Sequence, residues 1–104
     1  MIKVKIGYKD HIDNIKIDGH AMYDEFGKDI VCAGVSSIVT TTVNAILRFD
    51  KTSIKYEVKN GFVFINVLKD TKEVKLLLEN MIDLLKELEK KYKKNIKIEE
   101  VYLS

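Results

Sequence analysis

The sequence lacks proline and contains a single cysteine, Cys32. One cysteine excludes an intrachain disulfide, and nothing else in the chain requires an oxidising compartment, so we expect a cytoplasmic protein. Neither positive nor negative residues are in strong excess. The 18 lysine and arginine residues and the 16 aspartate and glutamate residues give a net charge of +2. This balance excludes the dense basic surface of a typical nucleic-acid-binding protein but leaves room for a small basic patch.

Signals for a membrane or a secretory route are also missing. The N-terminus has no unbroken apolar run and no small-residue cleavage site, so we predict no signal peptide. Residues 30–47 carry no charged side chain, but six serine, threonine and asparagine residues interrupt them. This polarity favours a buried helix over a membrane span. With 104 residues, 46% hydrophobic and 33% charged, the chain is expected to form one domain over residues 1–104.

The spacing of the apolar residues predicts five strands and two helices. Alternation of apolar and polar residues indicates strands with one buried face, and a 3.6-residue period indicates amphipathic helices. The order ββαββαβ predicts an α+β sandwich, with a mostly antiparallel sheet and both helices packed on one face. The expected strands are 2–8, 15–20, 54–59, 62–67 and 96–103, and the expected helices are 30–49 and 74–92.

The region around Cys32 is the strongest candidate for chemistry. Asp29 stands in the position of a helix N-cap, which makes Cys32 the third helical residue. The free backbone N–H groups and the dipole of such a helix start favour a thiolate, the nucleophilic form, and can hold an oxyanion. His20 ends the second strand beside Gly19, and we predict a mobile loop over 21–28, which has no apolar period.

His20 and Cys32 are predicted to meet as base and thiol, because a strand end, a loop and a helix start often come together at one end of a sheet. Two observations oppose this. Strict alternation directs His20 away from the helix-covered face, and a lone cysteine is often a small buried apolar residue. A zinc site is disfavoured because paired ligand spacing is missing, and His11 is interpreted as an exposed residue of the first hairpin turn.

A second feature is the hairpin around residues 60–61, whose Asn-Gly pair is a strong turn signal. A two-residue turn pairs Val58 with Val63 and Tyr56 with Ile65, and these four side chains are expected to form the core face. Phe62 and Phe64 then fall on the face opposite the helices, together with Lys55, Glu57 and Lys59. Two aromatic side chains on an otherwise polar face indicate a contact surface for a subunit or a ligand. The alternative is that lysine stems partly cover the rings.

Two motifs resemble those of the ribosomal-processing cysteine protease family, Prp. They are Gly19-His20-Ala21 and, after an acidic loop that contains a glycine, Asp29-Ile30-Val31-Cys32-Ala33-Gly34-Val35-Ser36. The resemblance also covers the length of the chain and the order of its elements. It implies a cysteine endopeptidase that removes a short N-terminal extension from a large-subunit ribosomal protein, the one numbered twenty-seven, and thereby supports ribosome assembly. It further implies a cut between an aromatic and a small residue, and a homodimer that needs no metal, cofactor, membrane or nucleic acid.

The resemblance places the nucleophile at Cys32 and the general base and acid at His20. Supporting roles are predicted for Asp29 as helix cap, for Ser36, one turn after Cys32, and for Asp18, which is placed to orient the imidazole. Ala21 and Gly27 are assigned to a substrate loop, with Gly27 as a hinge. A dyad without a third residue is equally compatible with the sequence. The competing hypothesis is a non-catalytic, ribosome-associated module that binds RNA or protein.

Overall fold

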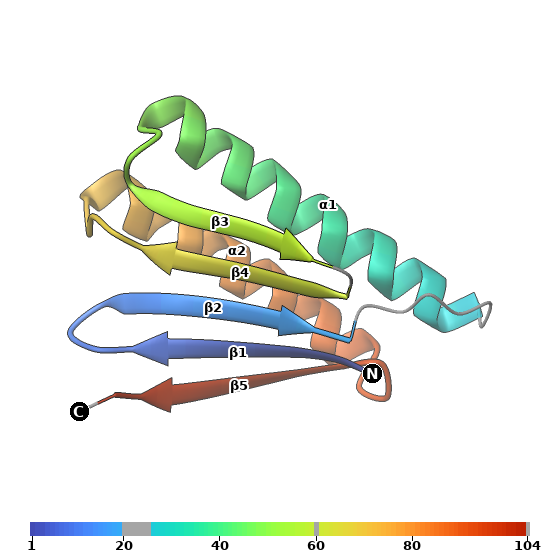
Figure 1. Cartoon of the computed structure of the whole chain (residues 1–104). Coiled ribbons are helices and arrows are strands. Elements are labelled where there is room, and N and C mark those ends of the chain that lie inside the picture. The colour runs from blue at the N-terminus through green and yellow to red at the C-terminus, as the bar shows by residue number, and fades with distance from the viewer. Residues whose placement is uncertain (20–25, 60, 104) are drawn as a thin grey trace.

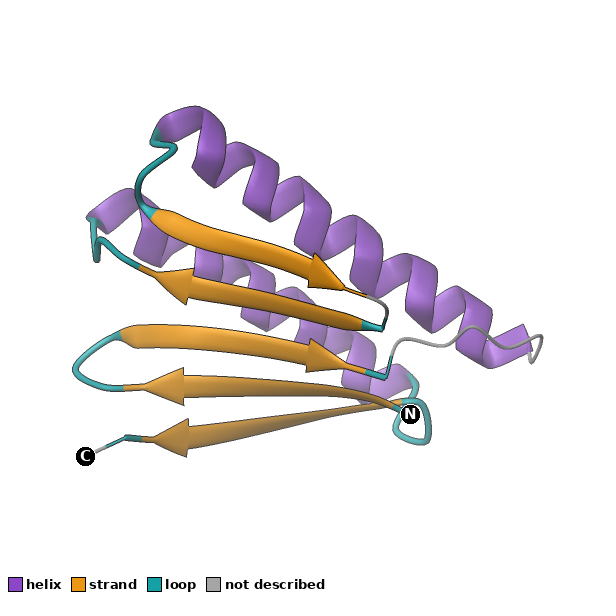
Figure 2. Cartoon of the chain, in the orientation of Figure 1, coloured by secondary structure: helices purple, strands orange, loops and turns teal. Residues whose placement is uncertain are grey.

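Two helices lie on one side of a five-stranded sheet in the computed structural model (Figures 1 and 2), which describes residues 1–19, 26–59 and 61–103. The order of the elements is ββαββαβ, as the sequence predicts. Their bounds are β1 Ile2–Tyr8, β2 Ile12–Asp18, α1 Phe26–Phe49, β3 Ile54–Lys59, β4 Phe62–Val67, α2 Lys72–Lys91 and β5 Ile96–Tyr102.

The strands are arranged in the order β3-β4-β2-β1-β5. Three neighbouring pairs are antiparallel, and β1 and β5 are parallel. The parallel pair follows from chain order, because β5 reaches the edge beside β1 only after α2 has crossed over the sheet. The predicted hairpin register is confirmed, since Val58 pairs with Val63 and Tyr56 with Ile65.

The core lies between the sheet and the two helices. One face of each central strand contributes isoleucine and valine side chains, and α2 contributes an amphipathic stripe. The apolar residues of the strands and those of the helices therefore face the same layer, as a two-layer sandwich requires. The helical residues buried in this layer are Val31, Val35, Val39, Val43 and Ile46 of α1 and Val74, Leu78, Met81, Ile82 and Leu85 of α2.

Helix α1 is long and apolar enough over Ile30–Phe49 to cross a membrane by length and composition, with a mean hydropathy of 1.8. Its valine stripe is nevertheless buried against the sheet, and it packs beside α2. One stripe of the helix thus contributes to the core, while 33% of the span as a whole is buried. The outward side of α1 remains uncharged as far as Arg48 in its last turn.

The start of α1 differs from the prediction. The helix begins at Phe26, so Asp29 is its fourth residue rather than its N-cap, and residues 26–28 are helical rather than part of a loop. A carboxylate is favoured by the helix dipole both at the cap and within the first turn. The position of Asp29 in the sequence therefore could not separate these two arrangements.

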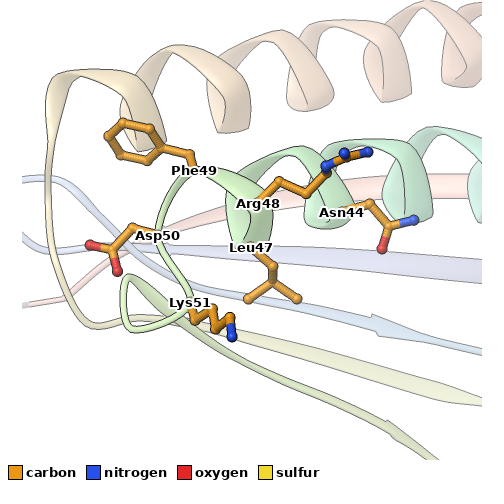
Figure 3. Close-up of a pocket in the computed structure, with 6 residues that line it drawn as sticks. All are labelled: Asn44, Leu47, Arg48, Phe49, Asp50 and Lys51. Atoms are coloured by element: carbon orange, nitrogen blue, oxygen red, sulfur yellow. The ribbon is translucent and has the colours of Figure 1, made fainter.

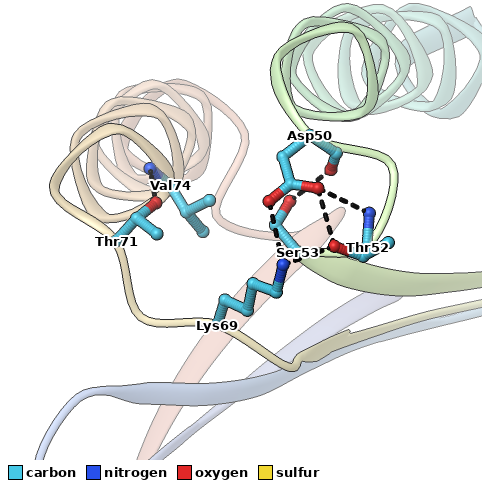
Figure 4. A network of polar contacts seen from close by, with 6 residues as sticks. All are labelled: Asp50, Thr52, Ser53, Lys69, Thr71 and Val74. Atoms are coloured by element: carbon cyan, nitrogen blue, oxygen red, sulfur yellow. Dashed lines mark hydrogen bonds and ion pairs between the residues drawn. The ribbon is translucent and has the colours of Figure 1, made fainter.

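A polar network connects α1 to β3 and to the chain before α2 (Figure 4). The Thr52 hydroxyl and backbone N–H both donate to the Asp50 carboxylate, at 2.7 and 2.9 Å, and this hydrogen bonding lowers the pKa of Asp50. Lys69 Nζ lies 3.3 Å from the same carboxylate. The α2 N-cap is Thr71, whose hydroxyl accepts from the Val74 N–H at 3.2 Å. The Thr71 bond satisfies one of the N–H groups that a helix start leaves free.

Candidate active site

Cys32 lies in the second turn of α1, as the seventh residue of the helix. Its thiol is free and half-buried, and it packs against the edge of the core. The neighbouring Val31 and Val35 are buried in the sheet interface. The nucleophile candidate is therefore held on a rigid helix and is neither fully packed away nor fully exposed.

Because α1 begins earlier than predicted, the backbone N–H groups that lack an intrahelical partner do not lie at Cys32. The four N–H groups without an intrahelical partner belong to residues 26–29, and the N–H of Cys32 bonds to the turn before it. The dipole effect is strongest in the first turn. The expected position of Cys32 among the free N–H groups is thus wrong, because these groups belong to the turn before it.

A groove of about 170 Å³ begins one turn after Cys32, between α1 and the strands. The groove is mainly apolar, with two hydroxyl groups along the helix side. Val58 at the end of β3 is 60% exposed, although alternation placed it in the core, because it borders this open groove. The lining residues are Ile17, Val35, Ser36, Val39, Thr40, Tyr56, Val58 and Val63.

The end of β2 is fixed beside this groove by Gly19. Its backbone has φ +80°, and its N–H donates to the Gly61 carbonyl at 3.0 Å. A Cβ at position 19 would lie 2.6 Å from the Met1 carbonyl oxygen. Only glycine fits this conformation and this contact without strain. Gly19 therefore determines where the chain leaves β2, immediately before His20.

We expect Gly19→Ala to lower the free energy of unfolding by about 1–3 kcal/mol, from left-handed backbone strain and the clash with Met1. Cleavage should fall further than the loss of folded protein explains, because the residue that follows is His20. Urea unfolding and peptide cleavage at equal folded fraction measure the two effects separately. A variant with wild-type stability and activity would contradict this role for Gly19.

The remaining predicted site residues fall into three groups. His20 and Ala21 lie outside the described residues, and the side chain of Asp29 is not described. Ser36 lines the groove, on the same stripe of α1 as Cys32. Asp18 lies on the helix-free face beside Phe62, so it does not line the groove, and its role toward His20 stays a prediction. Gly27 is the second residue of α1, which makes the expected loop hinge wrong at that position.

The other polar sites lie away from Cys32. A depression of about 820 Å³ surrounds the C-terminal end of α1 (Figure 3), and no cysteine, serine, threonine or histidine lines it. Its first lining residue, Asn44, is twelve residues beyond Cys32, or about 18 Å along the helix. His11 Nδ1 lies 3.9 Å from the Asp70 carboxylate, at the turn between β1 and β2. Within the described ranges, no cluster of three or more His, Cys, Asp or Glu residues could hold a metal ion.

The groove residues on β3 are the part of this site that the sequence did not reveal. Tyr56 and Val58 alternate with charged residues, and that pattern predicts a core face. Whether a helix covers such a face depends on where α1 crosses the sheet. The strand pattern contains no information on that crossing, so no local signal could have identified the groove.

Comparisons with known proteins give a consistent result. A family model described as cysteine protease Prp matches residues 1–97. The ribosomal processing cysteine protease Prp of Staphylococcus aureus is 36% identical over 103 residues, 94% of this chain and 97% of that protein. The protein of the same name from Bacillus subtilis is 28% identical over 92 residues, 82% of each chain. A crystal structure of S. aureus Prp in complex with a substrate peptide matches with a TM-score of 0.89 and 30% identity, covering 96% of this chain and 99% of that one.

Proposed function

The chain belongs to the cysteine protease Prp family and is a ribosomal-processing cysteine protease, and from this premise we propose that it removes the short N-terminal extension of the large-subunit ribosomal protein numbered twenty-seven. Cys32 is the nucleophile and His20 the general base and acid. The observation that carries the proposal is a half-buried free thiol on a rigid helix, at the end of an apolar groove.

The positions of the end of β2 and of the start of α1 support the pairing of His20 with Cys32. Ile17 of β2 and Val35 of α1 line the same groove. His20 lies three residues after Ile17, within about 10 Å along an extended chain, and Cys32 lies three residues before Val35, about 4.5 Å along the helix. Both residues are thus tied to the same end of the groove, within a distance that the chain can close.

The proposed reaction has two steps. His20 takes the proton of Cys32, a C–S bond forms at the scissile carbonyl, and the C–N bond breaks as His20 protonates the leaving amine. Water, deprotonated by His20, then attacks the acyl-enzyme and regenerates the thiol. The source of the oxyanion donors is not the N–H of Cys32, which is bonded within the helix. We propose that catalysis uses no metal or other cofactor and no nucleic acid.

The groove is the proposed pocket for an aromatic side chain of the extension, next to a cut before a small residue. Its volume of about 170 Å³ suits one ring, since a cavity of about 150 Å³ is sufficient to bind benzene. Ser36 and Thr40 add hydroxyl groups along one side. Selectivity should then depend on shape and apolar burial more than on charge.

Replacing the aromatic residue of the peptide with alanine is expected to lower kcat/KM by about 2–4 kcal/mol, or roughly 30- to 1000-fold. Val58→Glu should weaken cleavage of the aromatic peptide, because it places a charge at the mouth of the groove. The matched control is Leu76→Glu, at a residue of α2 that is 67% exposed. Mass spectrometry of peptide products measures both. Equal cleavage of both peptides would contradict the pocket assignment.

The same assay tests the proposed function itself. A synthetic peptide that spans the extension and the start of the mature ribosomal protein should be cut at one bond. The rate should change little between low and physiological salt, because few charges need to be neutralised. An uncut peptide, with the intact ribosomal protein also uncut, would overturn the substrate assignment.

Two further properties are part of the proposal. We propose that the protein works in the cytoplasm, where the ribosomal substrate is made, and that it forms a homodimer. Sedimentation of the purified chain distinguishes a dimer from a monomer directly.

A further inference from the structure

The face of the sheet opposite the helices, which we call the open face, has a composition that catalysis does not explain. Strand register sorts its side chains into three rows that run across all five strands. The rows are Lys59, Phe62, Asp18, Lys3 and Lys97, then Glu57, Phe64, Lys16, Lys5 and Glu99, and finally Lys55, Asn66, Asn14, Gly7 and Val101.

Two aromatic rings form the centre of the open face. Phe62 and Phe64 are two residues apart on β4, with ring centroids 6.5 Å apart and planes inclined by 9°. Both residues are half-buried, and the Lys16 ammonium lies 5.9 Å from the centre of the Phe64 ring. The rings are therefore parallel, accessible and bordered by a cation. A ring that served only to fill the core would lie on the other face.

The charge of the open face exceeds that of the whole chain. Six lysines against three carboxylates give the face three net positive charges, whereas the chain carries +2. Among the ion pairs of the described residues, the one on this face joins Lys55 to Glu57 at 3.4 Å. A depression of about 340 Å³ lies beside the rings, lined by Lys3, Val4, Lys5, Lys16, Asp18, Phe62, Lys97 and Glu99.

We propose that the open face binds single-stranded RNA, with bases stacked on Phe62 and Phe64 and phosphates paired with the lysines of β1, β2 and β5. Aromatic platforms bordered by cations are how sequence-tolerant proteins hold single strands. Unpaired bases are common in the loops and bulges of RNA, and aromatic residues on an open sheet stack on them. This binding is separate from peptide cleavage, which takes place on the other side of the sheet.

The distances between the β-strands place lysines where the phosphates of a single-stranded RNA would lie. Lys16 is directly beside Phe64, while Lys3 and Lys97 lie two and three strands from Phe62, or roughly 10 and 14 Å. A base on either ring thus has a lysine within reach of its own phosphate, and the next phosphates find lysines further across the sheet.

Two other occupants fit less well. A second copy of the chain, packed face to face, would bring the same net positive charge against itself, which opposes association. An acidic peptide would match the lysines but would leave the two parallel rings without a stacking partner. Charge and rings together favour nucleotides.

The test is fluorescence anisotropy of the full chain with a labelled oligouridine of about twelve nucleotides. The wild-type chain should bind it, and an RNA duplex of equal length should bind at least tenfold more weakly because paired bases cannot stack on the rings. Phe62→Ala with Phe64→Ala should weaken binding at least tenfold. The matched control, Phe49→Ala at a residue that is 49% exposed at the end of α1, should change nothing.

A second pair of variants tests the charges. Lys3→Gln with Lys97→Gln should reduce the slope of log affinity against log salt by about 0.7 for each lysine removed, measured between about 50 and 200 mM salt. Lys72→Gln with Lys75→Gln on α2 removes the same charge elsewhere and should have little effect. Circular dichroism and unchanged cleavage of the short peptide would show that all variants are folded.

Four outcomes would overturn the proposal. They are no binding up to about 200 µM protein, the weak end of non-specific affinity, equal losses in test and control variants, and tighter binding to an equivalent single-stranded DNA. The fourth is a wild-type dimer that the Phe62→Ala, Phe64→Ala variant converts to a monomer, which would assign the open face to a second copy.

Discussion

Replacing Cys32 with alanine is expected to abolish peptide cleavage while leaving the fold in place. The reaction has no other thiol available, because Cys32 is the only cysteine of the chain. The side chain is half-buried at the edge of the core, so losing one sulfur should change the free energy of unfolding by no more than about 1 kcal/mol. Cleavage should fall to the rate of the peptide without enzyme.

Cys32→Ser supplies the second arm of this experiment. The serine hydroxyl nearly preserves volume but is a much weaker nucleophile than a thiolate, so activity should again be lost. Alkylation of the wild-type chain with iodoacetamide should inactivate it in proportion to the label, since one site is available. Turnover by either variant at the wild-type rate would end the assignment of Cys32 as nucleophile.

Much of this fold could be predicted because the spacing of apolar residues that defines each strand and helix is local in the sequence. Strands with one buried face alternate in the sequence, and α2 places Val74, Leu78 and Leu85 at helical spacing. The predicted hairpin register was correct because an Asn-Gly pair leaves little choice of turn. The order of elements, together with the need to bury both helices on one face, then determined the two-layer sandwich.

The start of α1 could not be predicted for the opposite reason. Phe26, Gly27 and Lys28 have no apolar period in the sequence, so the pattern gave no signal that the helix includes them. Asp29 is compatible with a cap or with the first turn. The consequence was chemical as well as structural, because a helix that begins four residues earlier places Cys32 beyond the free N–H groups of its first turn.

The candidate site was predicted in part. The sequence directed attention to Cys32, whose role as nucleophile stays a prediction, but the groove beside it depends on where one helix crosses one edge strand. The 60% exposure of Val58 reflects that crossing and has no counterpart in the local pattern. The aromatic pair on the open face was visible from register alone, whereas its surrounding lysines came together only once five strands had been ordered.

The second large effect is expected at His20, and it distinguishes the two histidines of the chain. His11 and His20 flank β2, whose seven residues separate its ends by about 23 Å. His11 lies at the β1–β2 turn, near Asp70, while His20 follows Gly19 at the end where the groove begins. The position of His11 at the opposite end of β2 therefore leaves His20 as the imidazole that we propose as the base for Cys32.

His20→Ala should lower kcat for the extension peptide by about 10² or more, the usual scale for the loss of a positioned base. KM should change little, because His20 acts on the proton of Cys32 rather than on the bound segment, and added imidazole should restore part of the rate. His11→Ala should leave both constants near wild type, since its nearest charged partner is Asp70 at the far end of β2. The measurement is steady-state cleavage by both variants, with unfolding curves as controls. Equal losses from the two would show that the fold, and not a base at position 20, limits the rate.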